Sequence, residues 1–144
     1  MIDISIRFAS SDDAEALVAL IGALGYKATG VQMRQRLAAL IDRPDYVTFV
    51  ACDGETVVGL AGAFLHLAVE HDGQFARLTG LVVHENWRGR GIGARLMKRL
   101  EEWAQQQGAI AVMLTSGNHR HQAHDFYRHI GYQQTGVRFT KFLA

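Results

Sequence analysis

A glycine-rich turn in the middle of the chain constrains the fold more than any other feature. It reads Arg88-Gly89-Arg90-Gly91-Ile92-Gly93 and lies between an apolar run and an amphipathic one. The hydrophobic spacing changes there from strand-like to helical, so the turn leads into the start of a helix. Helix starts present free N–H groups and the positive end of the helix dipole, and glycine lets a ligand approach the backbone closely. The turn therefore predicts a phosphate cradle, and its two arginines suit a diphosphate.

Other interpretations of the glycines differ in what should surround them. A Walker loop needs Gly-Lys-Ser/Thr, which does not follow here. A dinucleotide loop fits Gly89–Ala94 as G-x-G-x-x-G/A, but the acidic ribose partner expected about 20 residues later is missing, because the next strand ends in Leu114-Thr115-Ser116. A nicotinamide-dependent oxidoreductase thus remains an alternative, although the acidic residue that would bind the cofactor ribose is missing. The structural alternative is a flexible connection before a basic helix face, which Arg95, Lys98 and Arg99 extend.

The order of apolar patterns predicts an α/β (α+β) fold with a mixed, mostly antiparallel central sheet flanked by helices. The expected order is β-α-α-β-β-β-α-β-α-β. Strands are expected at 2–8, 46–53, 55–70, 75–84, 109–115 and 137–143, and helices from a Ser10/Asp13 capping box, over 29–41, over 91–107 and over 119–130. Asp-Gly turns make the middle strands an antiparallel meander, and the step from 75–83 to 109–115 is a parallel crossover. Continuous apolarity predicts that 109–115 is a buried strand.

The composition is that of an ordinary globular protein. The chain has 144 residues, a net charge of +1 and one cysteine. That charge balance argues against nucleic-acid binding, and Cys52 lies in an apolar run and is expected to be a small buried side chain. No stretch reaches membrane-spanning length, and no signal-peptide pattern is present. We expect one domain over 1–144 that is soluble, cytoplasmic, independent of membranes, and either a monomer or a homodimer.

Two motifs together resemble the Gcn5-related N-acetyltransferases (GNAT). "RGRGIG" fits the Arg/Gln-x-x-Gly-x-Gly/Ala pyrophosphate loop of that family, and "SGNHRHQAHDFYRHIGY" is similar to its next motif. The matching positions of the second motif are Asn118, Ala123, Phe126, Tyr127, Gly131 and Tyr132. The order of elements also agrees, so the resemblance covers essentially the whole chain as a single N-acetyltransferase domain. The C-terminal segments further resemble bacterial small-molecule members, including aminoalkylphosphonate N-acetyltransferases.

This resemblance implies that acetyl-coenzyme A (acetyl-CoA) is the co-substrate. It implies that the turn holds the diphosphate through Arg88, Gly89, Arg90, Gly91, Ile92, Gly93 and Ala94. The backbone of Leu81, Val82 and Val83 is expected to pair with the pantetheine arm as an added strand would, and Asn118 is expected beside that arm. The Val83 N–H is the expected donor to the thioester carbonyl oxygen, where it stabilises developing negative charge.

The chemistry of acetyl transfer to an amine requires two proton movements. Alkylamines, with a pKa of about 10.4, are mostly protonated at neutral pH and must lose a proton before they attack. The leaving thiolate then takes up a proton, which a hydrogen-bonded tyrosine can supply. Tyr127 matches the family position for this acid, and the alternative is a tyrosine that only packs in the core.

The general base is an open question. The strand over 75–81 carries no carboxylate, although many family members place a glutamate there. The candidates are Glu70, His71, Asp72, His66, His84, Glu85 and Asp125, and deprotonation through water is a further possibility. For each of them the alternative, a solvated turn or surface residue, is the stronger interpretation.

Four histidines, His119, His121, His124 and His129, raise the question of a metal site. No cysteine and no His-Glu-x-x-His pattern accompanies them, so we expect no metal ligands. The sequence therefore predicts an acetyl-CoA-dependent N-acetyltransferase that acts on a primary amine of a small molecule by direct attack. The alternatives are a protein or peptide N-acetyltransferase and a non-catalytic acyl-CoA-binding module.

Overall fold

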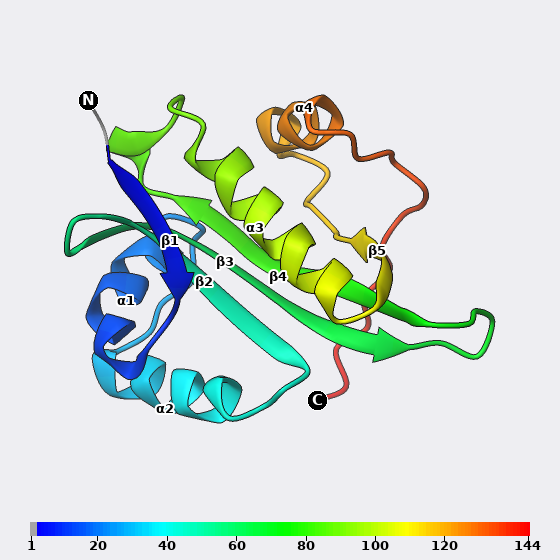
Figure 1. The fold of residues 1–144 in the computed structure, drawn as a ribbon, viewed down its shortest axis with the longest axis horizontal. Coiled ribbons are helices and arrows are strands. Elements are labelled where there is room, and N and C mark those ends of the chain that lie inside the picture. Colours follow the sequence, from blue (N-terminus) through cyan, green and yellow to red (C-terminus); the bar gives the residue numbers. More distant parts are fainter. Residues whose placement is uncertain (1–2) are drawn as a thin grey trace. The chain divides into compact units, whose positions relative to one another are not determined.

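The computed structural model describes residues 3–144, which divide into two compact units: one ends at Met113 and the other spans Leu114–Ala144. The first unit holds a five-stranded sheet in the order β1-β2-β3-β4-β5 (Figure 1). The strands are β1 (Ile4–Phe8), β2 (Tyr46–Asp53), β3 (Thr56–Leu67), β4 (Gln74–Val83) and β5 (Ala109–Met113). Every neighbouring pair is antiparallel except β4 and β5, which are parallel. The predicted mixed, mostly antiparallel sheet and its crossover are confirmed.

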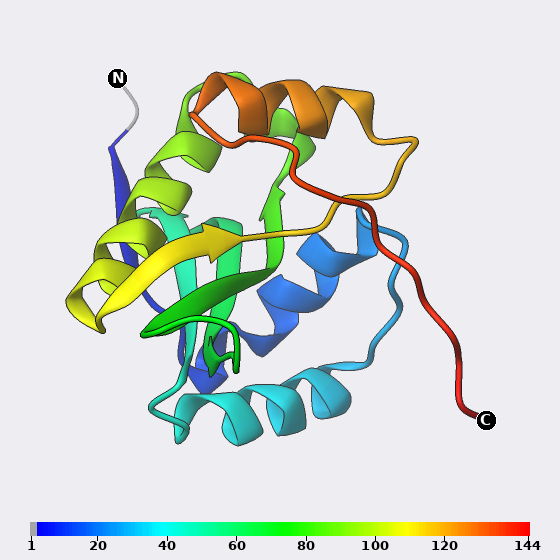
Figure 2. The same cartoon turned by 90° about the vertical axis from the view of Figure 1, so that its right-hand side faces the viewer.

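Helices cover both faces of this sheet. Their bounds are α1 (Ala14–Gly22), α2 (Gly30–Ile41) and α3 (Ile92–Gln106). Side chains alternate across a strand, so Val50 joins the core under α1 and α2, whereas Phe49 faces the other way and meets the Arg99 side chain of α3. Figure 2 shows α1 and α2 on one side of the sheet and α3 on the other. Cys52 is 1% exposed in the α1–α2 core, as the sequence predicts.

The junction between β1 and α1 is fixed by the predicted capping box. The Asp13 carboxylate accepts a hydrogen bond from the Ser10 backbone N–H at 2.8 Å, and a short 3₁₀ turn (Ser11–Asp13) leads into α1. Asp13 also accepts two hydrogen bonds of 2.8 Å from the Arg7 guanidinium. These contacts join the end of β1 to the start of the first helix.

Two predicted turns connect the middle strands. Gly54 and Gly73 adopt positive φ values of 60° and 85°, which glycine tolerates without a steric cost. The long β3–β4 hairpin that results runs beyond the helices at one end of the sheet (Figure 1). In residues 3–144 no helix is long and apolar enough to cross a membrane.

The second unit contains α4 (His121–His129). Within this unit the His124 ring Nε2 lies 2.9 Å from the Gly117 carbonyl oxygen, and Arg138 donates to the Thr115 hydroxyl at 3.3 Å. These contacts link α4 and the C-terminal segment to the residues that precede the helix.

Three expectations about strands need correction. The predicted strand over 137–143 is not formed, since that segment pairs with no strand of the described residues. The strand over 109–115 ends at Met113 and is not buried, because β5 is the edge of the sheet and Ile110 is 59% exposed. The strand expected at 2–8 begins at Ile4, and Ile2 lies outside the described residues.

Candidate acyl-donor site

The parallel strands β4 and β5 separate part-way along their length. Their pairing runs from Gln74 with Ala109 to Arg77 with Met113, whereas β4 stays paired with β3 as far as Val83. From Leu78 onward, the edge of β4 that faces away from β3 has no strand partner within the described part of the chain. The end of β4 therefore offers one open edge of backbone donors and acceptors.

The hydrogen bonding of β4 shows which groups face that edge. The His84 N–H donates to the Val58 carbonyl oxygen of β3 at 2.8 Å. Successive residues of a strand direct their backbone groups to opposite sides, so the N–H and C=O of Val83 point away from β3. The same alternation turns the backbone groups of Leu81 outward and those of Val82 toward β3. Of the three residues predicted to pair with a ligand, Leu81 and Val83 direct their backbone groups to the open edge, and Val82 directs its groups to β3.

The turn after β4 is held against the strand end by its own side chains. A 3₁₀ turn (Glu85–Trp87) follows β4, and the Arg88 Nε donates to the outward-facing Val83 carbonyl oxygen at 3.1 Å. The Arg90 guanidinium lies 4.9 Å from the centre of the Trp87 ring. Arg88 therefore links the open edge of β4 directly to the glycine turn.

The start of α3 leaves backbone donors free. Gly91 precedes the helix in the left-handed region with φ 79°, and no described side chain caps it. The first helical hydrogen bond runs from the Arg95 N–H to the Gly91 carbonyl oxygen at 3.1 Å, so the N–H groups of Ile92, Gly93 and Ala94 have no partner inside the helix. A methyl group built on Gly89 or Gly91 would meet no atom within 4 Å. The backbone is accordingly accessible to an anion at this point.

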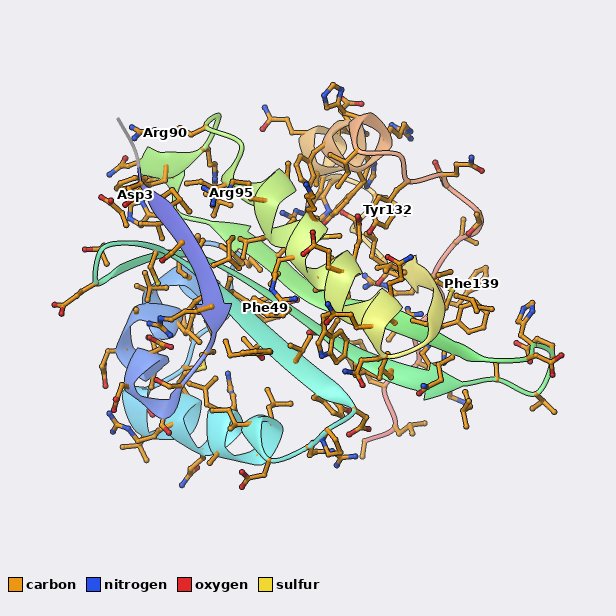
Figure 3. All side chains as sticks on the ribbon, viewed as in Figure 1. Asp3, Phe49, Arg90, Arg95, Tyr132 and Phe139 are labelled. Atoms are coloured by element: carbon orange, nitrogen blue, oxygen red, sulfur yellow. The ribbon has the colours of Figure 1, made fainter. Side chains whose placement is uncertain are left out.

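Two of the arginines along α3 are used by the fold itself. Arg95 donates to the Ile4 carbonyl oxygen of β1 at 2.7 Å, and the Arg99 guanidinium lies 4.6 Å from the centre of the Phe49 ring. Figure 3 shows Arg90 and Arg95 toward the loop end of α3. Lys98 is exposed. The positive charge that serves the turn therefore comes first from Arg88 and Arg90.

Asn118 and Tyr127 belong to the second unit, and each is described by its surroundings within that unit. Asn118 is exposed and precedes α4. The Tyr127 ring makes edge contacts with Phe126 and Tyr132 at centroid distances of 5.3 and 5.9 Å. Burial raises the pKa of the Tyr127 hydroxyl, and the positive charge of Arg120 lowers it to a smaller extent. The hydroxyl is therefore protonated at neutral pH.

The candidates for a general base are dispersed. Glu70, His71, Asp72 and Glu85 are exposed, and Asp125 lies 3.4 Å from Arg128. His84 uses its Nδ1 to accept from the Asn86 N–H at 3.1 Å. His66 differs from these, because its Nε2 is buried and has no hydrogen-bond partner in residues 3–144. Among the same residues, no group of three or more His, Cys, Asp or Glu side chains is placed to hold a metal ion.

Two pockets of the structure lie away from this site. These pockets of the first unit, of about 220 and 280 Å³, lie between α3 and β5 and beside the start of β2. Neither is lined by residues 81–94. The site consists of an open strand edge and an uncapped helix start, which residues 84–91 connect. An open strand edge offers groups that can pair with an extended chain of amides, and an uncapped helix start offers donors for a phosphate anion, which are two features that a coenzyme A donor site needs.

Comparison with known proteins gives the family. Residues 15–132 match the acetyltransferase (GNAT) family, a stretch that includes parts of both units. The chain belongs to this family and is an N-acetyltransferase. Members of the family take the acetyl group from acetyl-CoA, which is therefore the donor here.

Two curated relatives are named for small amines. The chain is 32% identical over 143 residues to the aminoalkylphosphonate N-acetyltransferase of Salmonella typhimurium, a match that covers 96% of this chain and 90% of the relative. It is 27% identical over 140 residues to the aminoglycoside N(6')-acetyltransferase type 1 of Stenotrophomonas maltophilia, covering 91% and 87% of the two chains. A solved GNAT family acetyltransferase of Staphylococcus aureus superposes with a TM-score of 0.84 at 27% identity over 99% of this chain and all of that one.

Proposed function

We propose that this protein transfers the acetyl group of acetyl-CoA to a primary amine of a small molecule by direct attack of the amine on the thioester. The observation that supports this proposal most is the open edge of β4. The Val83 N–H points outward at that edge, a few residues before the glycine turn. Acetyl-CoA supplies an activated acyl group. The family match extends through both units, so we include the whole chain in one N-acetyltransferase domain.

The residues of the first unit fit the donor at two places. The free N–H groups of Ile92, Gly93 and Ala94 would hold its diphosphate, with Gly89 and Gly91 leaving room for close approach and Arg88 and Arg90 adding charge. The outward backbone groups of Leu81 and Val83 would pair with the amides of the pantetheine arm. The Val83 N–H would then face the thioester carbonyl oxygen and stabilise the negative charge that develops on it.

We assign the proton that the departing sulfur takes up to Tyr127, with Asn118 beside the pantetheine arm. In the reaction the C–N bond forms, the C–S bond breaks, the amine loses a proton and the thiolate gains one. The raised pKa of Tyr127 keeps its hydroxyl protonated over the working pH range, which suits an acid that protonates a thiolate. The residue that accepts the amine proton is not assigned, because β4 carries no carboxylate.

A panel of amines tests this function. Free thiol release from acetyl-CoA is measured with aminoalkylphosphonates, polyamines, aminoglycosides and peptides with free N-termini, and mass spectrometry identifies the acetylated product. We expect turnover with at least one class of small amine. Turnover confined to peptides would replace the small-molecule proposal with the peptide alternative, and binding of coenzyme A without turnover of any amine would contradict the proposed function.

A further inference from the structure

A row of aromatic side chains crosses β2, β3 and β4 on one face of the sheet. Register places Tyr46 opposite Phe64, and His66 opposite Phe75. Ring centroids of successive members are 5.4 Å apart for Tyr46 and Phe64, 5.8 Å for Phe64 and His66, and 5.8 Å for His66 and Phe75. The donor site does not use these rings, so the aromatic row needs an explanation of its own.

The aromatic row lies on the face that carries α1 and α2. Val50 and Leu60 belong to the core beneath those helices, and Tyr46 and Phe64 each lie four residues along the same strands, hence on the same face. Tyr46, Phe64 and His66 are nevertheless half-buried rather than covered. Figure 1 shows β3 and β4 continuing past the two helices. Three of the four rings therefore form a partly open platform beside the helix pair, and Phe75 is buried.

Arg77 brings an unpaired positive charge to this platform. It stands opposite Phe64 in the β3–β4 register and therefore faces the same side. Its side chain is half-buried, yet the guanidinium makes no hydrogen bond or ion pair with any residue of 3–144. By contrast Arg43, which lies 5.0 Å from the Tyr46 ring, is 3.5 Å from the Asp45 carboxylate. A partly desolvated guanidinium without an anion is a site that favours an anionic ligand.

Two hydroxyl groups lie near Gly62, which pairs with Gly80 beyond Arg77 along β4. The β3–β4 register shifts by one residue after Gly62, which leaves Thr79 as the extra residue of β4. A methyl group built on Gly62 would lie 2.8 Å from the Thr79 Oγ1 and 3.9 Å from the Thr48 Oγ1, so both hydroxyls occupy the space above Gly62 on the platform face. The polar groups thus continue from Arg77 toward the end of β4.

The distance along β4 suits a small acceptor. Arg77 precedes Leu81 by four residues, which is about 13 Å of extended strand, less the shortening at the bulge. The long Arg77 side chain can extend over part of this distance. An acceptor with a few bonds between its amine and an anionic group would therefore reach from the guanidinium to the donor edge. Glu70 and Asp72 of the hairpin lie on the far side of Arg77 from Leu81 in the sequence.

We infer that Arg77 binds an anionic group of the acceptor, a phosphonate, phosphate or carboxylate, while the Thr48 and Thr79 hydroxyls line the path to the acetyl group. The acceptor is therefore an amine with an anionic end rather than a polycation. This inference rests on the proposed function, because it names the acceptor class of the same reaction. It selects between the acceptor types of the two relatives, since an aminoglycoside would bring positive charge to Arg77.

The test compares acceptors of matched length that differ in charge. Thiol release is measured with 2-aminoethylphosphonate, β-alanine, ethanolamine and putrescine for the unchanged protein and for Arg77→Gln, Arg77→Lys and Arg34→Gln. Arg34 is exposed on α2, so Arg34→Gln removes the same charge away from the platform. We expect Arg77→Gln to raise KM for the preferred anionic acceptor on the order of tenfold to a hundredfold, as loss of charged hydrogen bonds predicts. Arg77→Lys should recover part of this loss, and Arg34→Gln should cause none.

The outcomes separate the inference from the proposed function. Preference for ethanolamine or putrescine, or an equal effect of Arg77→Gln on all amines, would overturn the anionic acceptor and leave the acetyltransferase in place. Absence of turnover with every amine would overturn both. Calorimetry of acceptor binding to the protein saturated with coenzyme A gives a second measurement, in which Arg77→Gln should weaken only the anionic amines. Unchanged binding of coenzyme A itself shows that the variant is folded.

Discussion

Tyr127 combines a half-buried ring with a protonated hydroxyl. Its ring contacts Phe126 and Tyr132, and its backbone carbonyl oxygen accepts from the Tyr132 N–H at 2.9 Å. These contacts alone would fit a tyrosine that only packs. Because the pKa of the Tyr127 hydroxyl is raised, this hydroxyl also keeps its proton up to a higher pH than that of an ordinary tyrosine. One side chain can therefore serve both packing and acid catalysis. A substitution that removes only the hydroxyl oxygen distinguishes the two roles.

We predict that Tyr127→Phe lowers kcat on the order of a hundredfold and leaves the dissociation constant of coenzyme A nearly unchanged, because the ring stays and the proton donor is lost. Steady-state kinetics at saturating acetyl-CoA and calorimetry measure the two quantities. Tyr132→Phe is the matched control, since it removes a hydroxyl from the neighbouring ring of the same unit. An unaltered kcat in Tyr127→Phe would make Tyr127 a packing residue.

At the scale of elements, the residue before α3 has a backbone conformation that favours glycine. Gly91 has φ 79°, where a side chain costs about 1 kcal/mol or more, yet the space around it is empty. An added methyl group therefore has nothing to clash with in the protein itself. A ligand that approaches the free N–H groups of α3 would meet that methyl group.

We predict that Gly91→Ala raises the dissociation constant of coenzyme A at least tenfold, beyond its effect on folding. The control is Gly54→Ala in the β2–β3 turn, which has φ 60° and equally empty surroundings. Both variants should lose about 1 kcal/mol of unfolding free energy, because both force alanine into the left-handed region. Calorimetry and urea denaturation compare them. Equal affinities in the two variants would place the diphosphate away from this turn.

The sequence predicted the helices and turns that depend only on neighbouring residues. The spacing of Ile92, Leu96 and Leu100 predicted α3 to within one residue at each end, and Asp-Gly turns predicted the meander. Pairing depends on a partner elsewhere in the chain, so the alternation in 137–143 could not show that the strand would lack one. For the same reason the apolarity of β5 did not reveal that it lies at the sheet edge.

The candidate site also combines local features, which the sequence predicts, with long-range ones, which it does not. Its glycine turn consists of consecutive residues, and the sequence predicted it. The outward direction of the Val83 N–H depends on pairing with Val58, and the position of Arg77 depends on its register with Phe64. Both are long-range consequences of the sheet. The sequence showed only that β4 contains an arginine and no carboxylate that could act as a general base.

The stability of the whole molecule against acid should depend on the ion pair that joins β1 to α1. Asp13 is buried, with its side chain 6% exposed, whereas Arg7 is 46% exposed. Hydrogen bonds from Arg7 hold the pKa of Asp13 below its ordinary value, despite the opposing effect of burial. A carboxylate with a lowered pKa stabilises the folded state fully above its unfolded pKa of about 3.9, and this contribution disappears as the pH falls through the folded pKa.

We predict that Asp13→Asn lowers the unfolding free energy by about 1–2 kcal/mol at pH 7, a range that allows for the partial exposure of Arg7. The difference from the unchanged protein should persist down to about pH 5 and shrink below about pH 4, because protonation then removes the same charge from Asp13 itself. Urea denaturation at a series of pH values measures it, with Asp12→Asn, an exposed neighbour, as the control. A difference that is constant across this range would mean that the substituted amide disturbs packing, and that the Asp13 charge contributes nothing to the stability of the fold.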